Sequence, residues 1–119
     1  MDGRLTTHVL DLSKGLPAQN VKVELWALRD DDRRSLIKTA HTNSDGRVDS
    51  PLLQGDEIIP GEYELVFYVG EYFNREIIDV SVVPFLNKVP LRFGIRSKIE
   101  HYHIPLLVAP GGYSTYRGS

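Results

Sequence analysis

Apolar and polar residues alternate along much of the chain, which is the pattern of strands that bury one face. The alternation is clearest in Val21–Ala27, Tyr63–Val69 and Val89–Ile95. Pro90 indicates an edge strand or a bulge, because proline has no backbone N–H to donate to a neighbouring strand. Further strands are expected at Leu5–Leu12, Ser35–His41, Ile77–Val83 and Ile99–Val108, the last interrupted by Pro105.

Residues typical of turns separate these segments. Glycine, proline, asparagine and aspartate gather at Lys14–Pro17, Asn43–Gly46, Ile59–Gly61 and Pro110–Gly112. Seven or eight short strands at this spacing predict an antiparallel sandwich or barrel. One short helix is expected near Gly70–Glu76. Since no repeat or linker interrupts the pattern, residues 1–119 are predicted to form a single domain.

The composition narrows the classes of function. The 119 residues are 41% hydrophobic and 25% charged, as in ordinary globular proteins. A net charge of −2 argues against a nucleic-acid binder, which needs cations to neutralise phosphates. The absence of cysteine excludes disulfides and thiol nucleophiles. No apolar run is long enough for a signal peptide or a membrane span, so we expect a cytoplasmic protein without a membrane partner.

A few residues have side chains suited to catalysis or metal binding. His101 and His103 are two residues apart in an expected strand and therefore face the same side. His8 lies in another strand, and Arg47 follows the Asn43–Gly46 turn. Three imidazoles can bind zinc, whereas histidines in strands are more often structural, and the residues alone leave both interpretations open.

Four segments, in order along the chain, resemble the transthyretin-like family and, within it, the 5-hydroxyisourate hydrolases of urate (purine) degradation. They are Leu5–Asp11 with the following Gly15-x-Pro17-Ala18, Thr42–Arg47, Tyr102–Leu107 and Tyr113–Ser119. The resemblance implies an all-β sandwich of two four-stranded antiparallel sheets with one short helix, assembled as a homotetramer. It also implies that 5-hydroxyisourate is hydrolysed to 2-oxo-4-hydroxy-4-carboxy-5-ureidoimidazoline.

The resemblance further assigns roles to individual residues. Those implied to be catalytic are His8, Arg47, His103 and Ser119, and those implied to bind substrate are Tyr116 and Arg117. The histidines would act as acid and base, without a decision on which one activates water, and Arg47 would stabilise an oxyanion. His101 receives no role. The substrate carbonyl lies in an electron-poor ring, so neither a metal nor another cofactor is expected.

The same family includes secreted carriers of thyroid hormone, which provide the competing function. Those carriers lack the His and Arg set and the Arg-Gly-Ser ending that this chain has, so the resemblance favours the hydrolase. The ending also differs from the peroxisomal Ser-Lys-Leu signal, which favours the cytoplasm over the peroxisome without excluding the latter. At neutral pH Ser119 would contribute an ionised carboxylate to the site.

Overall fold

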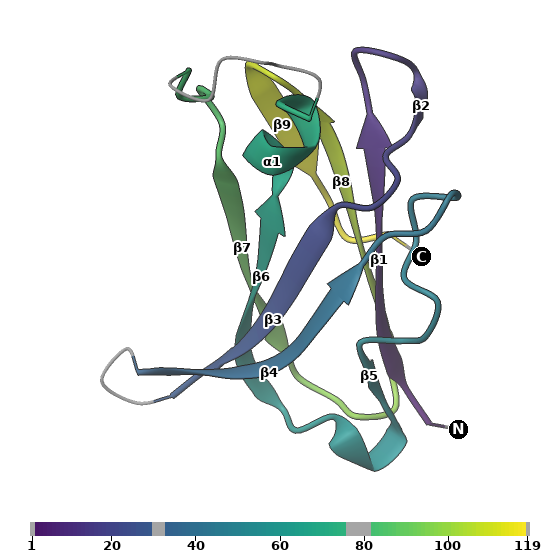
Figure 1. Ribbon diagram of the computed structural model, residues 1–119. Helices are drawn as coiled ribbons and strands as arrows, with labels where there is room; N and C mark the ends of the chain where they lie inside the picture. Colours follow the sequence, from purple (N-terminus) through teal and green to yellow (C-terminus); the bar gives the residue numbers. More distant parts are fainter. Residues whose placement is uncertain (1, 30–32, 76–81, 119) are drawn as a thin grey trace.

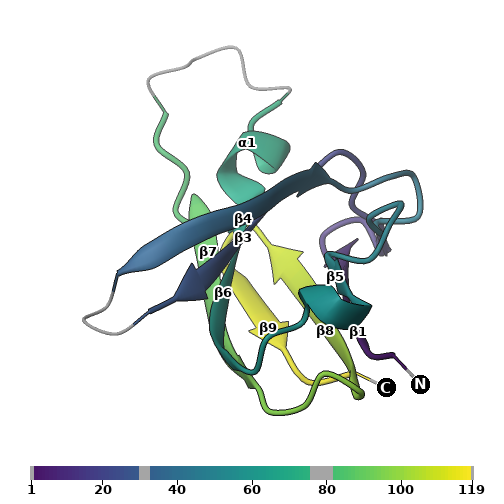
Figure 2. The same ribbon diagram turned by 90° about the horizontal axis from the view of Figure 1, so that it is seen from below.

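Two twisted β-sheets face each other in the computed structural model, which describes residues 2–29, 33–75 and 82–118 (Figures 1 and 2). The first sheet has the order β2-β1-β8-β9, and β5 pairs with the start of β1. The second has the order β4-β3-β6-β7. The strands of the first sheet are β1 (Arg4–Asp11), β2 (Leu16–Pro17), β5 (Leu53–Gln54), β8 (His101–Ala109) and β9 (Gly112–Thr115). Those of the second are β3 (Lys22–Leu28), β4 (Arg34–His41), β6 (Gly61–Tyr68) and β7 (Lys88–Ile95).

The expected sandwich with one short helix is confirmed, but the first sheet has five strands rather than four, and one strand pair is not antiparallel. Within the described residues the only α-helix is α1 (Val69–Phe73), and a 3₁₀ turn, η2, covers Gly55–Glu57. The pair β1 and β8 is parallel, in register from Arg4 with His101 to Asp11 with Val108, whereas antiparallel sheets were expected. The chain builds the entire second sheet between these strands, and this long crossover allows the parallel pairing.

Alternation along the strands places large apolar side chains between the sheets. Each fully buried leucine or phenylalanine contributes about 1.5–3 kcal/mol relative to an exposed one. The same alternation turns Thr6 and His8 of β1, and His103 of β8, to the outer face of the first sheet. Core residues that alternate in this way include Leu5, Val9, Val23, Leu25, Leu65, Phe67, Leu106 and Val108.

The two prolines of the predicted strands occupy different positions. Pro90 lies on β7, an edge strand, as predicted. Pro105 lies within β8, between β1 and β9, and does not interrupt the strand. The pairing of β8 with β9 ends at Leu106 and Thr115, so β9 requires no N–H from Pro105. The carbonyl of Pro105 instead accepts a hydrogen bond from Oγ1 of Thr115 at 2.7 Å.

Three short strands were not predicted, because each is too short to show alternation. β2 lies within the predicted Lys14–Pro17 turn, and β5 pairs only with the start of β1. β9 begins in the predicted Pro110–Gly112 turn and continues into the segment Tyr113–Ser119. Of the expected strand Ile77–Val83, residues 77–81 lie outside the described residues, and Val82 and Val83 are not in a strand. No helix in the described part of the chain is long and apolar enough to cross a membrane.

Candidate active site

The parallel register of β1 and β8 brings two histidines together on the outer face of the first sheet. Thr6 is paired with His103, and His8 with Pro105, so His8 and His103 are diagonal neighbours. Nδ1 of His8 lies 2.7 Å from Nε2 of His103, and the two rings stack with centroids 4.8 Å apart. Oγ1 of Thr6 lies 2.8 Å from Nδ1 of His103. Three polar groups therefore form one hydrogen-bonded chain across two strands.

A tight turn places Arg47 beside these hydrogen-bonded side chains. Oδ1 of Asn43 accepts hydrogen bonds from the backbone N–H groups of Asp45 and Arg47, and the carbonyl of Asn43 accepts one from Gly46. Gly46 has φ +74°, and a Cβ there would lie 2.5 Å from the carbonyl oxygen of Val9. Glycine thus permits both the turn and its approach to β1, which makes a β-bridge between His8 and Arg47.

Burial and charge keep both imidazoles neutral near pH 7. Partial burial lowers the pKa of His8 below its ordinary value, and the Arg47 guanidinium lowers it further. The pKa of His103 is lowered by burial first, then by His8 and Arg47. Arg47 is exposed, and no carboxylate in the described ranges forms an ion pair with it. The site therefore offers unprotonated imidazole beside an available cation.

The end of the described chain runs back beside β1 and β8 (Figure 1). The N–H of Gly118 donates to the carbonyl of His103 at 2.7 Å, in a β-bridge. A Cβ at position 118 would lie 2.8 Å from Cδ2 of His103, so a larger residue would displace either the ring or the terminal segment. Gly118 therefore packs its backbone directly against the edge of the imidazole.

The other residues singled out in the sequence lie away from the pair. The Arg117 guanidinium donates to the carbonyl of His101 and stacks over the Tyr102 ring, 4.4 Å from its centroid. Tyr116 and Arg117 line a hollow of about 390 Å³ that also includes β7. The side chain of His101 is exposed, and Ser119 lies outside the described residues. In a single chain, the structure thus gathers His8, Arg47 and His103, and not Tyr116 or Arg117.

The zinc interpretation requires a third ligand near His8 and His103. Among residues 2–29, 33–75 and 82–118, no group of three histidine, cysteine, aspartate or glutamate side chains is arranged to bind a metal ion. His101 does not join the pair, although it shares a strand face with His103. That no metal or other cofactor is needed stays a prediction.

The segments that resemble the family include Thr6, Asn43 and Gly118, but the sequence alone assigns these residues no role. Alternation alone indicates that the Thr6 hydroxyl lies on the same strand face as His8, two residues further along. The identity of its partner depends on the register of β1 with β8, which alternation does not determine. The hydrogen bonds of Asn43 are typical of an asparagine at the start of a turn, so the turn sequence alone could have predicted them.

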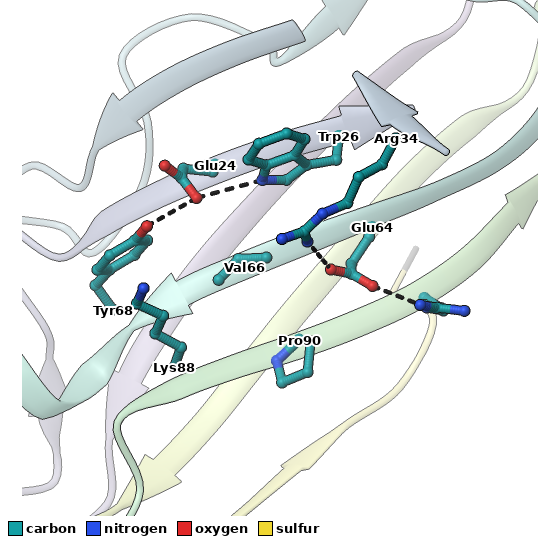
Figure 3. A pocket seen from close by; sticks show the side chains of 9 residues that line it. Glu24, Trp26, Arg34, Glu64, Val66, Tyr68, Lys88 and Pro90 are labelled. Atoms are coloured by element: carbon teal, nitrogen blue, oxygen red, sulfur yellow. Dashed lines mark hydrogen bonds and ion pairs between the residues drawn. The ribbon is translucent and has the colours of Figure 1, made fainter. Parts of the chain in front are cut away.

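A second hollow lies on the outer face of the other sheet and is lined by charged and aromatic side chains (Figure 3). Glu64 is buried, and its two oxygens accept from Arg34 and Arg92, each at 2.8 Å. Glu24 accepts from the Tyr68 hydroxyl at 2.9 Å. Because both carboxylates are satisfied by neighbouring strands, we interpret this network as support for the sheet.

Comparison with known proteins shows that the chain is similar to one family along almost its whole length. A family model described as the HIUase/Transthyretin family matches residues 5–118. The chain is 56% identical to 5-hydroxyisourate hydrolase 2 of Rhizobium meliloti, over 98% of this chain and 97% of that protein. It is 54% identical to a 5-hydroxyisourate hydrolase of Halalkalibacterium halodurans, over the full length of both.

Solved structures show the same fold. The structure of Klebsiella pneumoniae 5-hydroxyisourate hydrolase has a TM-score of 0.78 and 33% identity, covering 98% of this chain and 94% of that one. An (S)-allantoin synthase has a TM-score of 0.89 and 44% identity, over 99% of this chain but only 44% of the synthase. Transthyretin from Sparus aurata, at 24% identity and a TM-score of 0.85 over 97% of this chain and 96% of that one, shares the fold.

Proposed function

Because the chain belongs to the HIUase/Transthyretin family, we propose that it hydrolyses 5-hydroxyisourate to 2-oxo-4-hydroxy-4-carboxy-5-ureidoimidazoline. The hydrolases at 54–56% identity match this chain over almost their entire length, which supports the same activity here. The observation that carries the proposal is the contact between His8 and His103 at 2.7 Å beside an exposed arginine. This arrangement provides a base and a cation for attack by water on a carbonyl.

We assign the activation of water to His8. Both nitrogens of His103 are occupied, one by Thr6 and one by His8, and Nδ1 of His8 is occupied by His103. Nε2 of His8 is the ring nitrogen of the pair for which the described residues supply no partner. A general base must reach its proton directly, so this nitrogen is the one suited to accept a proton from water.

The proposed reaction consumes only 5-hydroxyisourate and one water molecule. The water oxygen bonds to the carbonyl carbon of the ring's acyl C–N bond while its proton passes to Nε2 of His8. The tetrahedral intermediate collapses, the C–N bond breaks, and His8 returns the proton to the departing nitrogen. The carbon becomes the carboxyl group of the product and the nitrogen part of its ureido group.

Arg47 supports this step through charge. The planar N–H groups of its guanidinium cation suit an oxygen that becomes negative. The same charge disfavours imidazolium in the free site and so keeps His8 ready to accept a proton. One residue thereby stabilises the intermediate and tunes the base.

The remaining assignments depend on assembly, and we propose a homotetramer in which neighbouring copies complete the site. Leu16 of the edge strand β2 and Leu12, directly after β1, are exposed apolar side chains at the end of the first sheet. The side chains of Tyr116 and Arg117, which line the hollow beside β7, are proposed to contact substrate in the assembled protein. Ser119 is proposed to belong to the same region.

The direct test is the ultraviolet decay of freshly prepared 5-hydroxyisourate with and without the protein. The proposal predicts faster decay with the protein, and the same rate after the protein is treated with a chelator. An unchanged decay rate would contradict the hydrolase and favour a carrier. Loss of activity on chelation, with recovery on adding zinc, would contradict the metal-independent mechanism.

A further inference from the structure

We propose that Thr6 is a positioning residue whose hydroxyl holds His103 in the tautomer that leaves Nε2 of His8 free to accept a proton. The inference rests on the proposed hydrolysis and adds a residue to its mechanism. The Thr6 hydroxyl contacts His103 and not Nε2 of His8, so it acts through the pair.

The geometry makes this contact specific. Thr6 is directly opposite His103 in the register of β1 and β8, and its Oγ1 lies 2.8 Å from Nδ1 of the ring. Thr7, the next residue, turns inward and donates to the carbonyl of Ile104 at 2.6 Å. Two adjacent threonines on β1 thus have hydroxyls with separate roles, one on the histidine pair and one in the core.

The direction of the hydrogen bonds between Thr6, His103 and His8 determines whether Nε2 of His8 can act as a base. A neutral imidazole carries one N–H, so the contact between His8 and His103 has one donor and one acceptor. If Thr6 accepts from Nδ1–H of His103, then Nε2 of His103 accepts from Nδ1–H of His8. Nε2 of His8 is then unprotonated and can accept a proton. If the order is reversed, that nitrogen carries a proton and cannot act as a base.

The hydroxyl also stabilises the protonated pair. After His8 takes a proton from water, its Nδ1–H can pass to Nε2 of His103, and Thr6 accepts from the resulting imidazolium. The charges that act on His103 are those of His8 and Arg47, and both lower its pKa. On the same face, Arg4 lies opposite His101 on the strands that carry the pair, and the Arg117 guanidinium faces Tyr102 instead. Thr6 therefore offsets part of the cost of charging the ring.

Thr6→Val tests the inference by replacing the hydroxyl with a methyl group of similar size. We expect kcat to fall by on the order of tenfold or more with little change in KM. The acid limb of the pH–rate profile should move to lower pH, because imidazolium loses an acceptor. Thr6→Ser should restore both values towards those of the wild type. Thr7→Val, the matched control on the same strand, should lower stability at most and leave the pH profile unchanged.

A measurement without substrate separates this inference from the proposed function. Nitrogen-15 NMR of the imidazoles at neutral pH should show the proton of His103 on Nδ1 in the wild-type protein and a change of tautomer in Thr6→Val. A wild-type proton on Nε2 of His103, or wild-type kcat and pH profile in Thr6→Val, would overturn the inference. Wild-type protein that fails to accelerate hydroxyisourate decay would overturn the function, while the NMR result would still test the role of Thr6.

Discussion

At the scale of single residues, the chemistry depends on which ring nitrogens are occupied and on how burial affects charge. Three of the four ring nitrogens of His8 and His103 take part in the hydrogen bonds that link the two rings to each other and to Thr6. Arg47 is held beside them by its turn rather than by an ion pair within the described residues, so its guanidinium is available to substrate. Each group alone is ordinary, and we propose that their combination provides a base, an electrostatic partner and a positioning hydroxyl.

The lowered pKa values of both histidines predict the pH dependence of the enzyme. The base must be unprotonated, so kcat/KM should rise with pH and level off, with a midpoint below about 6.5, the ordinary histidine value. Arg47→Gln should raise both histidine pKa values because it removes a cation, and Arg47→Lys, which keeps the charge, should change them less. NMR titration of the imidazoles measures these values independently of activity.

The same shifts have a definite sign for stability. A histidine whose pKa is lower in the folded protein binds protons more readily in the unfolded chain. Stability should therefore be unaffected by the pair above about pH 6.5 and fall as the pH drops from there towards the folded pKa. A midpoint of the kcat/KM profile above 6.5, or stability that rises on acidification through this window, would contradict the assignment.

At the scale of elements, each sheet has a distinct task. The first sheet supplies the site through the parallel contact of β1 with β8, and the second covers its inner face. On the outer face of the second sheet, Glu64 of β6 joins Arg34 of β4 to Arg92 of β7 (Figure 3). The carboxylate is buried, whereas the two arginine side chains are 47% and 59% exposed, so solvent weakens the pairing.

Glu64→Gln should therefore lower the free energy of unfolding by about 1 kcal/mol, since charged hydrogen bonds are lost near water. Urea unfolding measures this loss. Glu62→Gln, on the same strand and face but exposed, is the matched control and should change stability little. Hydroxyisourate turnover per subunit should be unchanged in both variants, because the site lies on the other sheet. Equal stability of the two variants would contradict the supporting role of Glu64.

The sequence predicted the elements better than the site that they form. Alternation located six long strands, and Pro90 correctly marked an edge, because these signals depend on local burial. The parallel pairing of β1 with β8 depends on a crossover through the whole second sheet, so local patterns do not contain it. The resemblance selected His103 over His101, whereas the contact of Thr6 with His103 emerges only from the register.

At the scale of the whole molecule, one side of the sandwich leaves two strand edges without partners in a single described chain. β7 ends the second sheet and β9 ends the first, and residues of both line the same hollow. Exposed edges are usually covered in stable proteins. Tyr113 of β9 and Tyr116 beyond it are 44% and 59% exposed, which suits burial in an interface.

Sedimentation at micromolar concentration should therefore report about four times the 13.5 kDa mass of one chain. Tyr113→Lys on β9 should weaken assembly, because a charge would enter the proposed interface, while Lys38→Glu on the opposite edge strand, β4, should not. A wild-type protein that sediments only as a monomer would contradict both the tetramer and the proposal that neighbouring copies complete the site.

The most direct test of the account compares two histidines on the same face of the same strand. The rate of 5-hydroxyisourate decay would be measured for the wild type, His103→Ala and His101→Ala, with circular dichroism confirming that each variant is folded. The account predicts that His103→Ala lowers kcat by on the order of a hundredfold or more, because the acid–base pair is broken. His101→Ala should stay close to the wild type. Equal losses in the two variants, or full activity in His103→Ala, would contradict the proposed site.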